Sequence, residues 1–175
     1  MNKPGTRRGY TTGACAQAAA RAAALTVAIG YLPCGVEAAE ESGIACEESG
    51  LVEITLPNGE DALFRMMMHG EGVVSIIKDA GDDPDITNGV QIFVCVAPRL
   101  DGIVTIEGAE GVGRVTLEGL PVKPGLPAIN PVPYKFIRQE VGSVLAGGAD
   151  VTVSTRPLSS QVIPSSSAAS TPQGR

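Results

Sequence analysis

The feature that most constrains the fold is an alanine-rich segment, TTGACAQAAARAAALTVAIG at residues 11–30, because alanine is the strongest helix former. Thr12 is a candidate amino-terminal cap, and a glycine ends the segment shortly before Pro33. Small side chains allow such a helix to pack very close to a sheet or to a bound ligand. Its amino end follows the residues RRGYTTG and offers free amides and a favourable dipole to an anion. An ordinary cap on a closely packed core helix explains the same residues equally well.

Strand patterns dominate the middle of the chain. Two apolar runs, at 52–56 and 61–66, are separated by a turn containing Pro57, Asn58 and Gly59, which predicts a hairpin. Other runs are apolar or alternate between apolar and polar residues. They predict strands at 72–77, 90–97, 102–108, 114–119 and 149–155.

A second helix is predicted from Pro131 to about residue 145, with Asn130 as its cap and Pro131 in its first turn. Its apolar positions are expected to face the core: Val132, Phe136, Ile137, Val141 and Val144. Its polar positions are expected to lie mostly outside: Lys135, Arg138 and Glu140. The pattern predicts an α+β fold, with a mixed, mostly antiparallel sheet and the two helices packed on one face.

The length of 175 residues suits one domain. We assign this domain to residues 1–157. Residues 158–175 are expected to form a disordered tail, because serine fills six of these eighteen positions. The acidic segment at 37–50 is expected to be irregular.

Charge and composition argue against several classes of function. A net charge of −6, three Tyr, three Phe and no Trp do not suit a nucleic-acid surface. The four cysteines lie far apart and His69 is the single histidine, so no zinc site or other metal site is expected. No apolar signal core and no membrane span are expected, and reduced thiols suit the cytoplasm. The expected partners are small molecules or proteins.

The first candidate site is the polar segment KDAGDDPDITNG at residues 78–89. It follows the predicted strand at 72–77, and sheets commonly place ligands where strands end. Four aspartates lie in this segment: Asp79, Asp82, Asp83 and Asp85. They can bind a cation, act as acid or base, or cap their own backbone in tight turns. A calcium loop is not expected, because its glycine and its final glutamate do not fall at the required spacing.

A second candidate is the glycine-rich turn GAEGVGRVT at residues 108–116. Its bare backbone allows a ligand to approach closely, and Arg114 is placed to hold a carboxylate or phosphate. The turn matches neither a P-loop nor a dinucleotide-binding motif. Basic residues near the candidate loops either attract an acidic ligand or are ordinary solvated charges: Arg7, Arg8, Lys78, Arg114, Lys135 and Arg138.

Four segments occur in a characteristic order: RRGYTTGACAQAAARAA at 7–23, KDAGDDPDITNG at 78–89, EGVGRVT at 110–116 and AINPVPYKFI at 128–137. In order and spacing they resemble the amino-terminal half of the CbiD family, the cobalt-precorrin-5B C1-methyltransferases of anaerobic cobalamin biosynthesis. The resemblance implies transfer of a methyl group from S-adenosylmethionine to C1 of a cobalt-bearing tetrapyrrole. Cobalt is then part of the substrate, and the protein mainly aligns the donor with the nucleophilic carbon.

The resemblance also implies roles for particular residues. Substrate binding is expected from Arg7, Arg8, Thr11, Thr12, Gly13, Lys78, Gly111, Gly113, Arg114 and Asn130. A catalytic aspartate is expected among Asp79, Asp82 and Asp83, either to orient the macrocycle or to accept a proton. Arg138 has a similar reason to lie near the anionic arms of the substrate.

Members of that family are longer than this chain, and the similarity stops soon after residue 155. We therefore expect a partner, either a second chain that supplies the other half or another copy of this chain. The alternative hypothesis is a non-catalytic module that binds the tetrapyrrole or assembles with a partner. The enzyme hypothesis predicts binding of both methyl donor and corrinoid, whereas the alternative predicts binding without turnover.

Overall fold

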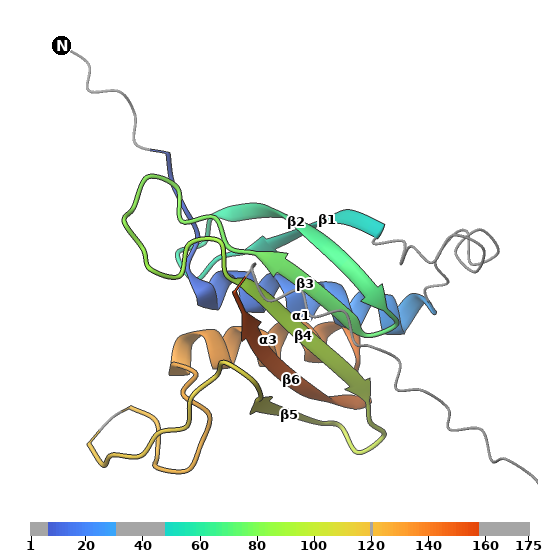
Figure 1. Cartoon of the computed structure of the whole chain (residues 1–175). Helices are drawn as coiled ribbons and strands as arrows, with labels where there is room; N and C mark the ends of the chain where they lie inside the picture. Colours follow the sequence, from blue (N-terminus) through green and yellow to red (C-terminus); the bar gives the residue numbers. More distant parts are fainter. Residues whose placement is uncertain (1–6, 31–47, 120, 158–175) are drawn as a thin grey trace, which may run out of the picture.

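A computed structural model describes residues 7–30, 48–119 and 121–157, which form one sheet and two long helices (Figure 1). The helices are α1 (Thr12–Ile29) and α3 (Pro131–Val144). The strands are β1 (Glu48–Thr55), β2 (Asp61–Gly70), β3 (Val73–Ile77), β4 (Gln91–Pro98), β5 (Ile103–Gly108) and β6 (Gly148–Arg156). The sheet order is β1-β2-β3-β4-β6-β5, and only the β5–β6 pair is parallel. The predicted α+β class is confirmed.

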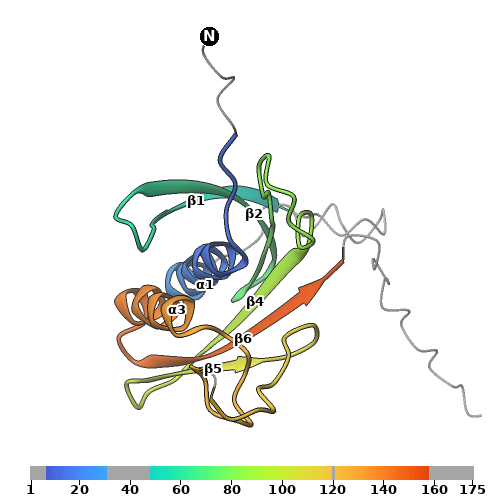
Figure 2. The same cartoon turned by 90° about the vertical axis from the view of Figure 1, so that its left-hand side faces the viewer.

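Helix α1 is the centre of the core. Figure 2 shows α1 and α3 on the same side of the sheet, which curls around α1. Most of the alanines of α1 are fully buried, and they pack with the inward-facing residues of the central strands. These inward residues include Ile76, Ile92, Val94 and Val151. Because alanine side chains are small, the helix axis comes close to the sheet, and the curled sheet can enclose it.

The two ends of α1 follow local rules with one correction. Gly30 ends the helix in the left-handed conformation, with φ at 61°, and donates its N–H to the carbonyl of Thr26. The amino-terminal cap is Thr11, whereas Thr12 was predicted. Thr11 has an extended backbone and accepts a hydrogen bond of 3.1 Å from the amide of Ala14, so Thr12 is already the first helical residue.

The predicted hairpin is confirmed as β1 and β2, joined at Gly59, where φ is +85°. Both strands are longer than predicted, and residues 48–50 belong to β1 although the sequence suggested an irregular segment there. Cross-strand pairing extends them, since residues 48–51 of β1 pair with residues 65–68 of β2.

The strand predicted at 114–119 is wrong. In its place the structure has an isolated bridge between Arg114 and Pro127. The partner segment cannot continue a ladder because it contains three prolines, which lack an N–H group. Gly119 and Gly125 also adopt positive φ values of 88° and 86°, which bend the chain away from a strand.

Three positions on α3 also differ from expectation. Val132 is 53% exposed and does not enter the core, and Phe136 is only half-buried and lies outside the core cluster. Glu140 is drawn inward, because it accepts hydrogen bonds from Gln17 and Arg21 of α1. The predicted tail at 158–175 lies outside the described residues. Among the helices that the structure describes, none is long and apolar enough to cross a membrane.

Candidate functional site

Residues 7–10 lie against the loop 78–82, and this contact brings together two of the segments singled out in the sequence. The amide of Tyr10 donates to the carbonyl of Asp79 at 2.8 Å, and the amide of Asp82 donates to the carbonyl of Arg7 at 3.1 Å. Gly9 lies so close to the loop that a Cβ there would be 1.8 Å from the carbonyl carbon of Ala80. Only glycine fits this backbone contact, which places the loop beside the start of α1 (Figure 1).

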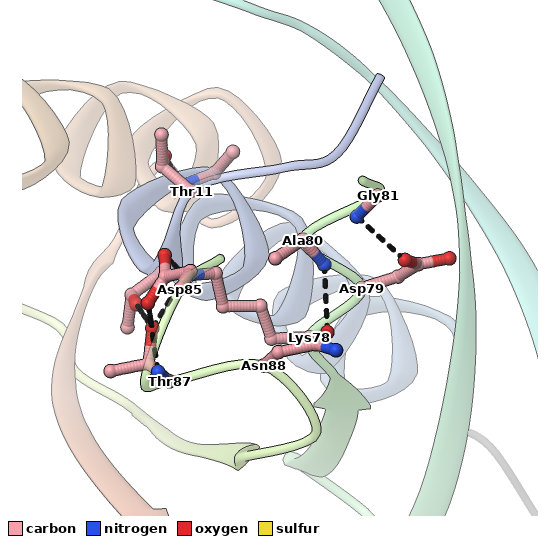
Figure 3. Close-up of polar contacts among 10 residues, drawn as sticks. Thr11, Lys78, Asp79, Ala80, Gly81, Asp85, Thr87 and Asn88 are labelled. Carbon is pink, nitrogen blue, oxygen red and sulfur yellow. Dashed lines mark hydrogen bonds and ion pairs between the residues drawn. The ribbon is translucent and has the colours of Figure 1, made fainter. Parts of the chain in front are cut away.

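The polar side chains of the loop mainly hold its own backbone (Figure 3). Asp79 accepts from the amide of Gly81 at 2.9 Å, and Asp85 accepts from the amide of Thr87 at 2.7 Å. Asn88 accepts from the amide of Ala80 at 2.9 Å. Of the three roles open to the aspartates, the geometry therefore shows backbone capping for Asp79 and Asp85.

Lys78 is a buried cation at the base of this loop, directly after β3, with only 3% of its surface exposed. Its Nζ contacts the carboxylate of Asp85 and donates to Oγ1 of Thr87 at 2.5 Å (Figure 3). These hydrogen bonds from Lys78 and Thr87 hold the pKa of the Asp85 carboxyl well below its usual value. The loop thus keeps a charged pair on the wall of a cavity.

Two adjoining cavities open between the starts of both helices and the two candidate loops, and we call them together the cleft. The first cavity, about 400 Å³, is lined by Thr11, Thr12, Gly13, Ala14, Gln17, Pro57, Lys78, Asp85, Thr87, Asn130, Val132 and Pro133. The second, about 310 Å³, is lined by Thr12, Gly13, Ala16, Thr87, Val90, Gly111, Val112, Gly113, Ala128, Ile129, Asn130, Pro133, Ile137, Val153 and Thr155. Both volumes fall in the range of small-molecule sites.

The starts of α1 and α3 meet in the cleft through one close contact. A Cβ on Gly13 would lie 2.9 Å from Cβ of Pro133, so a glycine is needed there. Asn130 occupies the cap position of α3, as predicted, but its side chain makes no capping hydrogen bond. Pro133 has no N–H to donate to it, which leaves the Asn130 side chain on the cleft wall.

The structure separates the predicted site residues into two groups. The first group lines the cleft: Thr11, Thr12, Gly13, Lys78, Gly111, Gly113 and Asn130. The second group is absent from the lining of both cavities: Arg7, Arg8, Arg114, Asp79, Asp82 and Asp83. The segments 7–23, 78–89 and 110–116 each contribute to both groups, so the fold divides these three segments between the cleft lining and positions outside it.

The three arginines of the second group are engaged by the protein itself. Arg7 forms a bidentate ion pair with Asp79, with N–O distances of 2.8 and 2.9 Å between the guanidinium and the carboxylate. Arg8 forms a similar pair with Glu60, and this contact raises the pKa of the exposed Arg8 guanidinium. Arg114 donates to the carbonyl of Gly125 at 2.7 Å. They therefore brace the loops around the cleft.

Sequence reasoning missed several residues that line the cleft, among them Gln17, Thr87, Pro133 and Thr155. It considered Asp85 only as one of four equivalent aspartates. A signal for Gln17 was present, because it is a lone amide within the alanine run ACAQAAA, where a buried polar side chain requires a partner. No comparable signal marks Thr87, whose role follows from the buried position of Lys78.

Cys15 lies on α1 with 1% of its surface exposed, and burial raises the pKa of its thiol to about 12. Because the thiolate is the reactive form, we expect iodoacetamide at mildly alkaline pH to modify Cys15 only after unfolding. The exposed Cys95 should react in the folded protein and serves as the control. Mass spectrometry of the two labelled peptides measures both rates, and equal rates in the folded protein would contradict this assignment.

Fold and cleft together define an α+β domain with a ligand-sized site, lined by both apolar and polar residues, at the amino ends of two helices. The chain belongs to the CbiD family, whose profile matches residues 1–158. No solved structure matches it.

Similar curated proteins carry the name cobalt-precorrin-5B C(1)-methyltransferase. The one from Bradyrhizobium sp. strain BTAi1 is 40% identical over 161 residues, covering 87% of this chain and 38% of the relative. The one from Moorella thermoacetica is 43% identical over 145 residues, covering 81% and 35%. The one from Methylococcus capsulatus is 44% identical over 143 residues, covering 78% and 33%. The chain thus spans between a third and two-fifths of these relatives.

Proposed function

We propose that this chain contributes to S-adenosylmethionine-dependent methylation of cobalt-precorrin-5B at C1, a step of anaerobic cobalamin biosynthesis in the cytoplasm. The observation that carries the proposal is the cleft, because residues from all four segments that resemble the CbiD family line it. The names of the relatives support the same reaction.

The chemistry of the cleft suits this reaction. Methyl transfer is a displacement at a sulfonium carbon, so the protein must chiefly align two reactants and exclude water. The start of α1 supplies amides and a favourable dipole for negatively charged groups, and Lys78 adds a buried cation. Gly111 and Gly113 present bare backbone at the second cavity, where a macrocycle can approach closely.

We assign substrate binding to the predicted residues that line the cleft. For the second group we propose a supporting role, in which Arg7 and Arg8 hold the loop and the hairpin at the rim. Asp79 and Asp82 act in the same way, since both are tied to Arg7. Asp83 is exposed and remains the candidate among the three for contact with a substrate above the rim.

The alternative is a non-catalytic module that binds the tetrapyrrole or assembles with a partner. One observation favours it: the chain spans at most 38% of the length of the relatives described above. Under this alternative a second chain, or another copy of this one, contributes the groups that complete the reaction. Binding of the tetrapyrrole would then occur without methyl transfer.

The test is to incubate the purified chain with S-adenosylmethionine and cobalt-precorrin-5B and to follow the tetrapyrrole by mass spectrometry. We expect a product heavier by one methyl substitution. A shifted corrinoid absorption spectrum without product would favour the binding module. If neither a methylated product nor a spectral shift is observed, both proposals are overturned.

The Gly113→Leu variant is expected to weaken tetrapyrrole binding at least about tenfold, because the side chain fills the second cavity. A Cβ at this position would meet only Cβ of Ala128, at 3.9 Å, so the backbone can accept the change. Spectroscopic titration measures the affinity. The matched control is Gly142→Ala, on the exposed side of α3 and outside the cleft lining. Equal affinity of Gly113→Leu and the wild type would contradict the assignment.

A further inference from the structure

We propose that the first cavity holds the amino-acid end of the methyl donor, an α-ammonium carboxylate, with Gln17 as the acceptor for the ammonium group. The inference rests on the proposed function, since it assigns one of the two reactants to one part of the cleft. The first observation is that the side-chain amide of Gln17 is buried while its oxygen accepts no hydrogen bond from the described residues.

The orientation of the Gln17 side chain follows from its partners. Gln17 is 1% exposed, and its Nε2 donates to the carbonyl of Thr55 at 3.0 Å and to Oε1 of Glu140 at 2.9 Å. Both partners are pure acceptors, so the amino group must point at them. Arg21 holds Glu140 in place through a contact of 2.8 Å. The carbonyl oxygen Oε1 therefore faces the other way.

Within the described part of the chain, no group donates a hydrogen bond to Oε1 of Gln17. Every described side-chain nitrogen or oxygen that is sealed from solvent has a partner, so Oε1 must retain an open side. The space that Gln17 lines is the first cavity. Because Gln17 lines this cavity, a ligand that enters it can donate a hydrogen bond to Oε1, as an ammonium group does.

The carboxylate has its own place one helical turn away. Thr12 and Gly13 are the first two residues of α1, so their amides have no intrahelical acceptor, and Thr11 caps only the amide of Ala14. Gly13 and Gln17 lie four residues apart and therefore share one face of the helix. Both line the first cavity. Donor amides and an acceptor oxygen thus stand within the reach of a single small zwitterion.

This chemistry distinguishes the donor from the tetrapyrrole. The acetate and propionate arms of a tetrapyrrole are acceptors when ionised, so they can use the helix amides but cannot satisfy Oε1 of Gln17. An α-ammonium carboxylate satisfies both. We therefore assign the tetrapyrrole to the second cavity, beside Gly111 and Gly113. The methyl carbon on the sulfonium of the donor then points toward the boundary between the two cavities.

The experiment compares three ligands on the whole chain by isothermal titration calorimetry. They are S-adenosylmethionine, its decarboxylated form, and 5′-methylthioadenosine, which lacks the amino-acid end. We expect the decarboxylated form to bind at least about tenfold more weakly than S-adenosylmethionine, and 5′-methylthioadenosine more weakly still, because charged hydrogen bonds are lost. Equal affinities for the three ligands, or no binding of S-adenosylmethionine, would overturn the proposal.

A variant pair tests the role of Gln17. Gln17→Leu should weaken S-adenosylmethionine about tenfold and leave the affinity for 5′-methylthioadenosine unchanged. Gln139→Leu, the same substitution at an exposed position of α3, should change neither affinity. If Gln17→Leu weakens both ligands equally, the side chain has only a structural role and the proposal fails. If Gln17→Leu does not fold, the comparison of the three ligands on the wild-type protein still tests the donor site.

The outcomes separate this inference from the proposed function. Selective binding of S-adenosylmethionine without methyl transfer would keep the donor site and remove the reaction from this chain. Methyl transfer with no preference for the amino-acid end would keep the reaction and overturn the donor site.

Discussion

The Gly9→Ala variant is expected to lose the contact between residues 7–10 and the loop 78–82, with a loss of about 3 kcal/mol in the free energy of unfolding. The new Cβ would lie 1.8 Å from the carbonyl carbon of Ala80 and 2.0 Å from its oxygen. Both neighbours are backbone atoms, so no change of side-chain rotamer relieves the clash. Urea denaturation measures the loss, and hydrogen exchange at the Tyr10 amide, which donates to Asp79, reports the local separation.

The control for this prediction is the opposite effect of the same substitution elsewhere. Gly142 lies within α3, and a Cβ there would be 4.0 Å from its nearest neighbour. Gly142→Ala should therefore raise the free energy of unfolding by about 0.5–1 kcal/mol through helix propensity. A Gly9→Ala protein with wild-type stability and a protected Tyr10 amide would show that the segment is not held against the loop.

The Asp85→Asn variant is expected to lower the melting temperature by roughly 10 °C, because it leaves the buried ammonium of Lys78 without its carboxylate. The double variant Lys78→Met/Asp85→Asn should recover part of this loss, since it removes the buried charge itself. Differential scanning calorimetry measures all three proteins. A double variant less stable than Asp85→Asn would contradict the view that the unpaired cation is the cause.

The same pair predicts a dependence on pH. Hydrogen bonds from Lys78 and Thr87 lower the pKa of Asp85 in the folded protein, whereas its unfolded value is about 3.9. The stabilisation is therefore complete above about pH 4 and is lost as the pH falls toward the folded pKa. The stability difference between wild type and Asp85→Asn should be constant near neutrality and shrink below about pH 4. Urea denaturation at a series of pH values checks this, and a difference that grows in acid would contradict it.

Most elements of the fold were predictable because their signals are local. The alanine run specifies α1, the turn at Gly59 specifies the hairpin, and the alternating residues specify the remaining strands. The prediction failed at 114–119, where the apparent strand depends on a partner segment that prolines make unable to pair. It also failed for Val132, because an apolar residue in the first turn of a helix can face a cavity as readily as a core.

The candidate site was predictable only in outline. Residues from all four segments line one cleft in the structure, and seven of the ten expected substrate-binding residues are among them. The sequence left two roles open for the basic residues near the loops, and it did not distinguish Lys78, which is buried in the cleft wall, from Arg7 and Arg8, which pair with carboxylates. The ion pairs of Arg7 and Arg8 join residues more than fifty positions apart in the sequence.

By itself, the sequence determined where helices and turns form, because propensities, caps and glycine conformations act over a few neighbouring residues. It also determined the family, through the order of four short segments. The tertiary structure alone decided which side chain of each segment faces the cleft. The pairing of Arg7 with Asp79 and the direction of the Gln17 amide arise only when segments distant in the sequence meet, since each depends on a partner supplied by the folded chain. Lys78 and Asp85 lie only seven positions apart, but the conformation of the loop between them decides that they pair.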